Sequence, residues 1–150
     1  MSDSDFLELC KSGDAKKVEE AILNGANVNA KANDGSTALM YALDNDTAKI
    51  LIEYGADVNA KDSRGKTALM YALDSDIAET LIEHGADANA RDNDGMTALM
   101  WAAITNNSTL EAIIGYSDVN ARDNYGVTAL MMAQGYPDAE DLLRYCGAES

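Results

Sequence analysis

The apolar residues of this chain cluster in short helical runs separated by polar turns, and the same order of elements recurs along its length. Thr is a favourable N-cap, and Ala, Leu and Met favour helix, so a Thr-Ala-Leu-Met run predicts the first turn of a helix. A second apolar run follows each of these phrases, and Gly stops it at Gly55 and Gly85, as at many helix C-termini. The Thr-Ala-Leu-Met runs begin at Thr37, Thr67, Thr97 and Thr128.

A turn precedes each of these helices at a fixed interval. Asp or Asn leads into a Gly two residues before each Thr, and this composition favours a tight turn. The turn glycines are spaced 30, 30 and 31 residues apart, which is typical of a solenoid built from stacked units. These glycines are Gly35, Gly65, Gly95 and Gly126.

A second phrase keeps register with the first: G-A-N-V-N-A at Gly25, G-A-D-V-N-A at Gly55, G-A-D-A-N-A at Gly85 and S-D-V-N-A at Ser117. Together the two phrases resemble the ankyrin repeat, whose usual phrase is T-P-L-H-x-A over about 33 residues. The resemblance covers nearly the whole chain and implies an all-α solenoid of about five helix-turn-helix units with short β-turn tips. We expect a single domain over residues 1–150, with units at about 5–31, 32–61, 62–91, 92–122 and 123–148.

Three units depart from the family pattern. The second and third lack three residues between their helices, so we expect both helices there to be about one turn shorter, with Asp46 and Asp76 as caps of the second helix. In the fourth unit Gly115 comes early, which predicts an altered helix exit. In the fifth, Pro137 fits the first turn of the last helix.

Net charge restricts the expected partners. The chain has 26 acidic and 11 basic residues and a net charge of −15, which disfavours nucleic acid and anionic membranes and is compatible with a basic protein partner. Solubility alone is the alternative explanation of the charge. No run of 18 apolar residues and no signal peptide is visible, so we expect a cytoplasmic protein. Cys10 and Cys146 lie in the first and last units, too far apart for a disulfide.

The residue after each Thr-Ala-Leu-Met phrase is a large side chain, and the resemblance places this position on the concave face. Such a row predicts contacts with a partner, because Tyr and Trp dominate binding hot spots. Packing between units is the alternative, and both remain open. A Met replaces the family His in each phrase, and we expect these Met side chains in the core. They are Met40, Met70, Met100 and Met131. The row consists of Tyr41, Tyr71, Trp101 and Met132.

The turn tips, which the family uses for contacts, vary between units while their frame does not. Drift of exposed turns explains this variation equally well, but Met96 and Tyr125 are apolar where exposure is expected. Asp44 and Asp74 are expected at the rim of the concave face, where they would receive cations from a partner. The tip candidates are Asp34, Arg64, Lys66, Asp94, Met96 and Tyr125. We interpret Lys31, Lys61, Arg91 and Arg122 as a column of solvated charge.

The sequence holds no convincing catalytic or metal site. His84 is the only His, and no nucleophile-and-base arrangement can be assigned around it. The run D-N-D-G at Asp92 fails as a calcium loop, because Ala90 and Trp101 fall where ligands are required.

We therefore predict a non-catalytic, monomeric module without cofactors that binds another protein through its concave face and tips. An inhibitor or immunity protein of a basic partner is the narrower form of this prediction. The alternative function is a structural or self-assembling scaffold without a specific groove.

Overall fold

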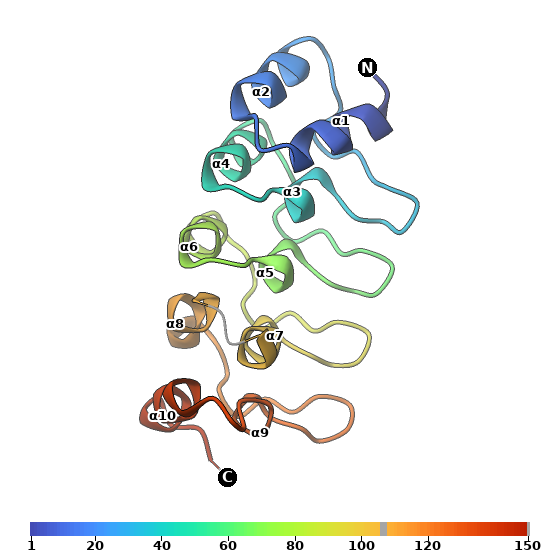
Figure 1. Ribbon diagram of the computed structural model, residues 1–150. Helices are drawn as coiled ribbons and strands as arrows, with labels where there is room; N and C mark the ends of the chain where they lie inside the picture. The colour runs from blue at the N-terminus through green and yellow to red at the C-terminus, as the bar shows by residue number, and fades with distance from the viewer. Residues whose placement is uncertain (106–107, 150) are drawn as a thin grey trace.

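The chain forms a stack of paired helices (Figure 1). The structure is a computed structural model and describes residues 1–105 and 108–149. In chain order the elements are α1 (Asp3–Lys11), α2 (Ala15–Leu23), α3 (Ala38–Tyr41), α4 (Asn45–Glu53), α5 (Ala68–Tyr71), α6 (Ser75–Glu83), α7 (Ala98–Thr105), α8 (Thr109–Ile113), the 3₁₀ helix η1 (Ile114–Tyr116), α9 (Ala129–Met132) and α10 (Pro137–Tyr145).

Two columns of helices run along the stack. The first helices of the pairs, α1, α3, α5, α7 and α9, pack on one another in order, and α2, α4, α6 and α8 form the second column. The loops that join one pair to the next project to one side (Figure 1). We call these loops, residues 30–37, 60–67, 90–97 and 121–128, the fingers. This arrangement confirms the predicted all-α repeat solenoid.

Most of the second helices end in the same way. Gly25 has φ +96°, and its N–H donates to the Ile22 carbonyl at 2.9 Å, while the Ala26 N–H donates to Ala21 at 2.9 Å. This pair of bonds is the Schellman motif, which needs a left-handed residue after the helix. Gly55, Gly85 and Gly147 repeat it. The fourth unit differs as predicted, because α8 has only five residues and Gly115 lies in η1.

Between the columns lies a continuous apolar core. Leu69 and Leu99 are 2% and 1% exposed, as the repeat pattern predicts. The predicted Met core holds for the first three positions, Met40, Met70 and Met100, which are all buried. Met131 is 39% exposed, so the prediction is wrong there, because no further first helix of the described chain covers α9.

The shortened units keep full second helices. Helices α4 and α6 have nine residues, as α2 does, whereas α3 and α5 have only four, so the predicted shortening of both helices is wrong for the second one. The reason is the cap. Asp44 accepts from the Thr47 N–H at 2.7 Å, and Asp74 accepts from the Ile77 N–H at 2.9 Å. Capping therefore begins two residues earlier than the predicted positions Asp46 and Asp76, and the first helix alone is shortened.

An asparagine in each inter-unit loop bonds to the following unit. The Asn59 side chain donates to the Gly85 carbonyl at 2.9 Å and accepts from the Asp87 N–H at 2.8 Å. Because both groups of one amide are used, the bond fixes the direction as well as the distance between units. The equivalent bonds recur along the stack, and we call the set the asparagine ladder: Asn29, Asn59, Asn89 and Asn120.

The fingers are also joined to one another. The Asn93 N–H donates to the Arg64 carbonyl at 2.9 Å, and the same kind of bond joins the other neighbouring fingers. All four side chains of the basic column are exposed, in agreement with its interpretation as solvated charge, and three of them also make hydrogen bonds. Lys61 donates to the Arg91 carbonyl at 2.8 Å, Arg91 donates to the Arg122 carbonyl, and Arg122 donates to Gly126 at 2.8 Å.

Both cysteines are free, at opposite ends of the helix order. Cys10 is buried in α1, and burial raises the pKa of its thiol to about 11. Cys146 is exposed at the end of α10.

Replacing Leu99 by Ala should destabilise the protein by about 2–5 kcal/mol, because it opens a cavity in the core. The matched control is Leu73→Ala, at a position that is 64% exposed and should change stability by less than about 0.5 kcal/mol. Urea denaturation measures both values. Equal losses in the two variants would contradict the assigned helix register.

Removing one amide of the asparagine ladder with Asn59→Ala should cost about 1–2 kcal/mol, because it leaves the Gly85 carbonyl and the Asp87 N–H without their partner. Asn33→Ala is the control, since Asn33 makes no side-chain hydrogen bond within the described residues and should be nearly neutral. Thermal or urea unfolding distinguishes the two. A neutral Asn59→Ala would mean that water replaces the bond without loss.

Candidate functional site

Three aromatic side chains form one row across the stack. Tyr41, Tyr71 and Trp101 come from α3, α5 and α7, which pack in succession, and each is partly exposed while it packs against the core. Met132 holds the equivalent position in α9 and is also partly buried. We call the surface formed by the first helices and the fingers the groove face. Packing and exposure therefore coexist at these positions.

A finger carboxylate fixes Tyr71. The Tyr71 hydroxyl donates to Asp62 Oδ2, and Arg64 Nη2 donates to the Tyr71 hydroxyl oxygen at 3.1 Å. Asp62 Oδ1 accepts from the N–H groups of Arg64 and Lys66, both at 2.9 Å. Burial alone would raise the pKa of Asp62, but the bonds from Tyr71 and the two N–H groups outweigh it, and the pKa falls below its usual value. Asp62 thus holds both the ring and the turn.

Trp101 is fixed in the same way one unit later. Its indole Nε1 donates to Asp92 Oδ2 at 3.0 Å, while Asp92 Oδ1 accepts from the N–H groups of Asp94 and Met96, both at 2.9 Å. Beside Tyr41 the corresponding finger residue is Ala32. The Tyr41 hydroxyl makes no hydrogen bond to the described residues. The row thus has two fixed rings and one without a carboxylate partner.

The Lys66 ammonium lies between two rings of the row. Its Nζ is 4.1 Å from the centroid of Tyr71 and 3.8 Å from that of Trp101, distances typical of cation–π contacts. The residue is only 7% exposed, and burial, with the neighbouring Arg64, lowers its pKa. The prediction that Lys66 is an exposed tip contact is therefore wrong. Lys11 takes a similar place, 4.4 Å from the Tyr41 centroid.

The tips divide into inward and outward positions. Met96 is 8% exposed, so the expectation of an exposed Met is wrong. Met96 directly follows the turn Gly of its finger, as Lys66 does in the preceding finger, and both side chains are buried. Tyr125, at 78% exposed, is the large apolar tip that remains in solvent. The tips Asp34, Arg64 and Asp94 are exposed as well.

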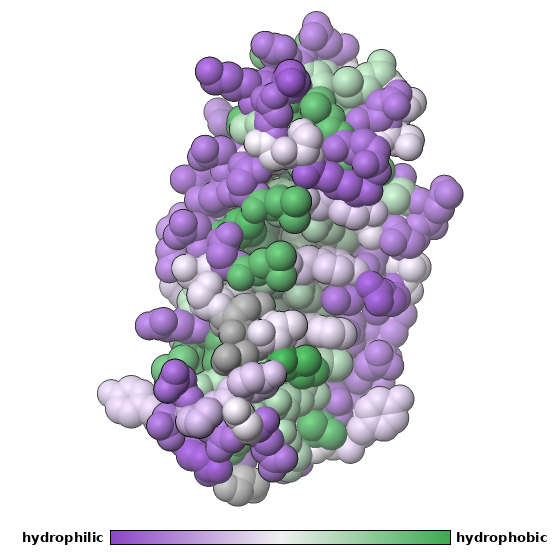
Figure 2. All heavy atoms as spheres, viewed as in Figure 1, coloured by the Kyte–Doolittle hydropathy of each residue, from purple (hydrophilic) through white to green (hydrophobic). Residues whose placement is uncertain are grey.

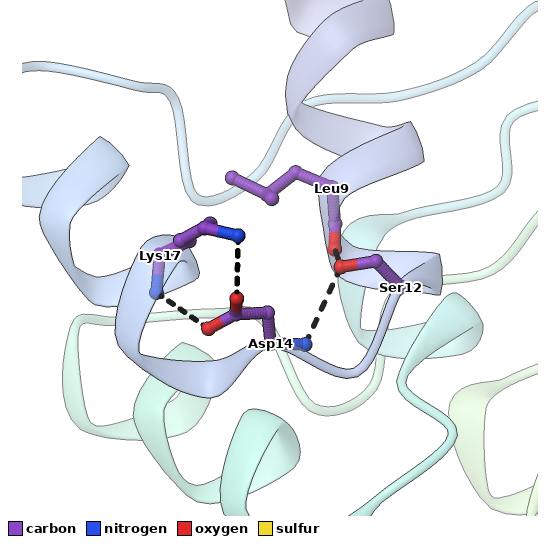
Figure 3. Close-up of polar contacts among 4 residues, drawn as sticks. All are labelled: Leu9, Ser12, Asp14 and Lys17. Carbon is purple, nitrogen blue, oxygen red and sulfur yellow. Dashed lines mark hydrogen bonds and ion pairs between the residues drawn. The ribbon is translucent and has the colours of Figure 1, made fainter.

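The links, which join the two helices of one pair, differ between units. In the first three units they are residues 12–14, 42–44 and 72–74. In the first link, Asp14 accepts from the Lys17 N–H at 3.2 Å and pairs with its ammonium at 2.9 Å, and Ser12 donates to the Leu9 carbonyl at 2.6 Å (Figure 3). In the next two links Thr47 and Ile77 replace Lys17. Asp44 and Asp74 therefore cap their helices without a cation partner among the residues described.

A hollow of about 340 Å³ opens where the first finger meets α1. The Tyr41 ring and the finger residues Lys31, Ala32 and Asn33 form one side, and Leu7 and Lys11 of α1 lie on the other. Ala32 stands where the later fingers carry Asp62 and Asp92, so its short side chain leaves room beside Tyr41. The hollow is large enough to receive a side chain of a partner.

Sequence reasoning missed the finger aspartates and the asparagine ladder. A signal for both was present, since Asp62 and Asp92 stand three residues before a turn Gly and nine before an aromatic, and each G-A-x-x-N-A phrase carries the Asn. His84 lies at the C-cap of α6, where its Nδ1 is 2.7 Å from the Thr80 carbonyl. Within the described ranges, no three His, Cys, Asp or Glu side chains are placed to hold a metal ion.

Comparison with known families gives one result. The family model described as "Ankyrin repeats (3 copies)" matches residues 6–92 and 74–150. The chain belongs to the ankyrin-repeat family. A search of curated proteins found no match. Ankyrin repeats are generally protein–protein interaction modules and are typically non-catalytic. Among the helices of the residues described, none has the length and apolar character needed to cross a membrane.

Replacing Tyr71 by Phe in this ankyrin stack should cost about 1–2 kcal/mol, because it removes the hydroxyl that joins Asp62 and Arg64. The matched control is Tyr41→Phe, at the position with Ala32 in place of the Asp, which should be nearly neutral. Chemical denaturation gives both values. If the two variants lose the same stability, the Asp62 bond does not hold the ring.

Proposed function

We propose that this ankyrin-repeat protein binds a segment of a partner protein across its groove face. The observation that carries the proposal is the aromatic row Tyr41, Tyr71 and Trp101, which stays partly exposed although two of its rings are fixed by polar bonds. Buried packing alone would not leave all three rings partly exposed. The large rigid rings are the side-chain types that dominate binding hot spots.

Preorganisation supports this proposal. A ring that must be ordered on binding loses about 0.5–1.5 kcal/mol of conformational entropy, which lowers affinity. The Asp62 and Asp92 bonds order Tyr71 and Trp101 before a partner arrives, and Lys66 fills the space between them. The hollow beside Tyr41 and the exposed tips Asp34, Asp94 and Tyr125 extend the contact surface on either side, and Met132 extends the row.

The partner that we propose is a basic protein, because the net charge of −15 favours association with an opposite charge. An inhibitor or immunity protein that covers a basic enzyme is the narrower form of this proposal. The protein would act as a monomer and as one domain over residues 1–150, in the cytoplasm.

The test is affinity capture from the source cell, followed by titration of the captured protein with purified variants. Trp101→Ala should weaken binding by about 2 kcal/mol, or roughly thirtyfold, because it removes the largest ring of the row. Tyr145→Ala is the control, since Tyr145 is an equally aromatic but fully solvated residue at the end of α10. Added salt should slow association with a basic partner.

Stability must be measured in parallel, because Trp101 also contacts Asp92 and Lys66. A folded Trp101→Ala variant that binds as tightly as Tyr145→Ala would refute groove binding and favour a scaffold. An association rate that does not respond to salt would refute the basic partner and leave the groove intact.

A further inference from the structure

We propose that the links of the second and third units form a separate contact strip for a basic, leucine-bearing segment of a partner. The strip consists of Leu43 and Leu73 with the four aspartates that follow them, Asp44, Asp46, Asp74 and Asp76. Figure 2 shows hydrophobic side chains in a column over the links between first and second helices, with hydrophilic side chains beside them. The aromatic row lies elsewhere on the first helices, so this surface is additional to the groove contacts.

The two leucines do not serve the core. Leu43 and Leu73 are 63% and 64% exposed, and neither belongs to the buried cluster. In the fourth unit, whose first helix is eight residues long, the corresponding position is Ala103, which is fully buried. The early end of α3 and α5 therefore turns this position outward, where a polar residue would satisfy the fold equally well. Identical large apolar residues on two successive units indicate a contact surface.

Hydrogen bonds to the following unit hold the links that carry the leucines. Asn45 accepts from the Thr80 hydroxyl of the next second helix at 2.7 Å. One unit later, the Thr109 hydroxyl donates to the Ala72 carbonyl at 3.0 Å. Each leucine thus lies within two residues of a hydrogen bond to the following unit, which limits the ordering cost of a contact there.

Charge identifies the occupant. Asp46 and Asp76 are exposed, and Asp44 and Asp74 have no ion-pair partner in the described part of the chain. The groove face differs, because cations already lie on its rings: Lys11 on Tyr41, and Lys66 between Tyr71 and Trp101. The uncompensated negative charge beside apolar side chains thus lies at the links, and a segment with both Lys or Arg and Leu complements it.

Repeat spacing sets the pattern of that segment. Helices that pack as α3 and α5 do are separated by about 8–10 Å. A segment in the polyproline II conformation has three residues per turn and advances about 3.1 Å per residue, so residues i and i+3 lie on one face at about this distance. The strip therefore fits a polyproline II segment with an apolar residue at every third position and basic residues between.

This inference rests on the proposed function only in requiring a basic protein partner. The probe is a fluorescein-labelled peptide of three Lys-Leu-Lys units, followed by fluorescence anisotropy. A Lys-Ser-Lys peptide of the same length and charge reports purely electrostatic binding. The leucine peptide should bind at least about tenfold more tightly, since burial of two leucines supplies that difference.

Two pairs of variants locate the peptide. Leu43→Ser with Leu73→Ser should remove the preference for the leucine peptide and leave serine-peptide binding unchanged. Asp46→Asn with Asp76→Asn should weaken both peptides more than Glu53→Gln with Glu83→Gln. The latter pair makes the same change of charge at exposed equivalent positions, at the other ends of α4 and α6. Thermal melts should show that all three double variants are folded, because every altered side chain is exposed.

The proposal is overturned if the leucine peptide fails to bind, if it binds no better than the serine peptide, or if the leucine variant retains the preference. It is also overturned if the two acidic pairs behave alike. A preference lost in Trp101→Ala but kept in the leucine variant would place the peptide in the groove, which overturns the strip and supports groove binding. Loss of the strip and loss of the groove are thus separate outcomes.

Discussion

The asparagine amide between successive units is the constraint on which every surface of this protein depends. Apolar burial supplies most of the free energy of stacking, but it is not directional and would tolerate sliding of one unit on the next. An amide that donates to a carbonyl and accepts from an N–H of the next unit permits one register. Asn29, Asn59, Asn89 and Asn120 repeat this bond, so equivalent side chains fall into rows. Both proposed contact surfaces are such rows.

The net charge of −15 is not spread evenly over these rows. Asp62 and Asp92 are buried under the groove face, where N–H groups and aromatic donors satisfy them. Lys66 and Lys11 lie on the rings above. Because these charges are matched locally, a basic partner gains little from them. The carboxylates at the second and third links have no such match, so electrostatic steering would favour approach from that side.

Local rules in the sequence were enough to predict the helix order, the glycine stops, the burial of Leu69 and Leu99 and the altered exit at Gly115. They could not place Lys66, whose burial depends on Trp101, thirty-five residues later in the next unit. Nor could they choose between Asp44 and Asp46 as cap, because both residues suit that role and only the end of the first helix decides. Of the candidate site, the aromatic row was predictable, and the bonds that hold it were not.

The proposed leucine strip lies on the two units that lack three residues. In both units the first helix ends after four residues, as α9 also does, the Asp that follows Leu caps the second helix, and the Leu lies outward. The fourth unit, which keeps a long first helix, buries Ala103 instead and stacks in the same column. The stack therefore does not require the shortening or the Leu. A feature that the fold can do without, and that two neighbouring units share, is better explained by a partner than by stability.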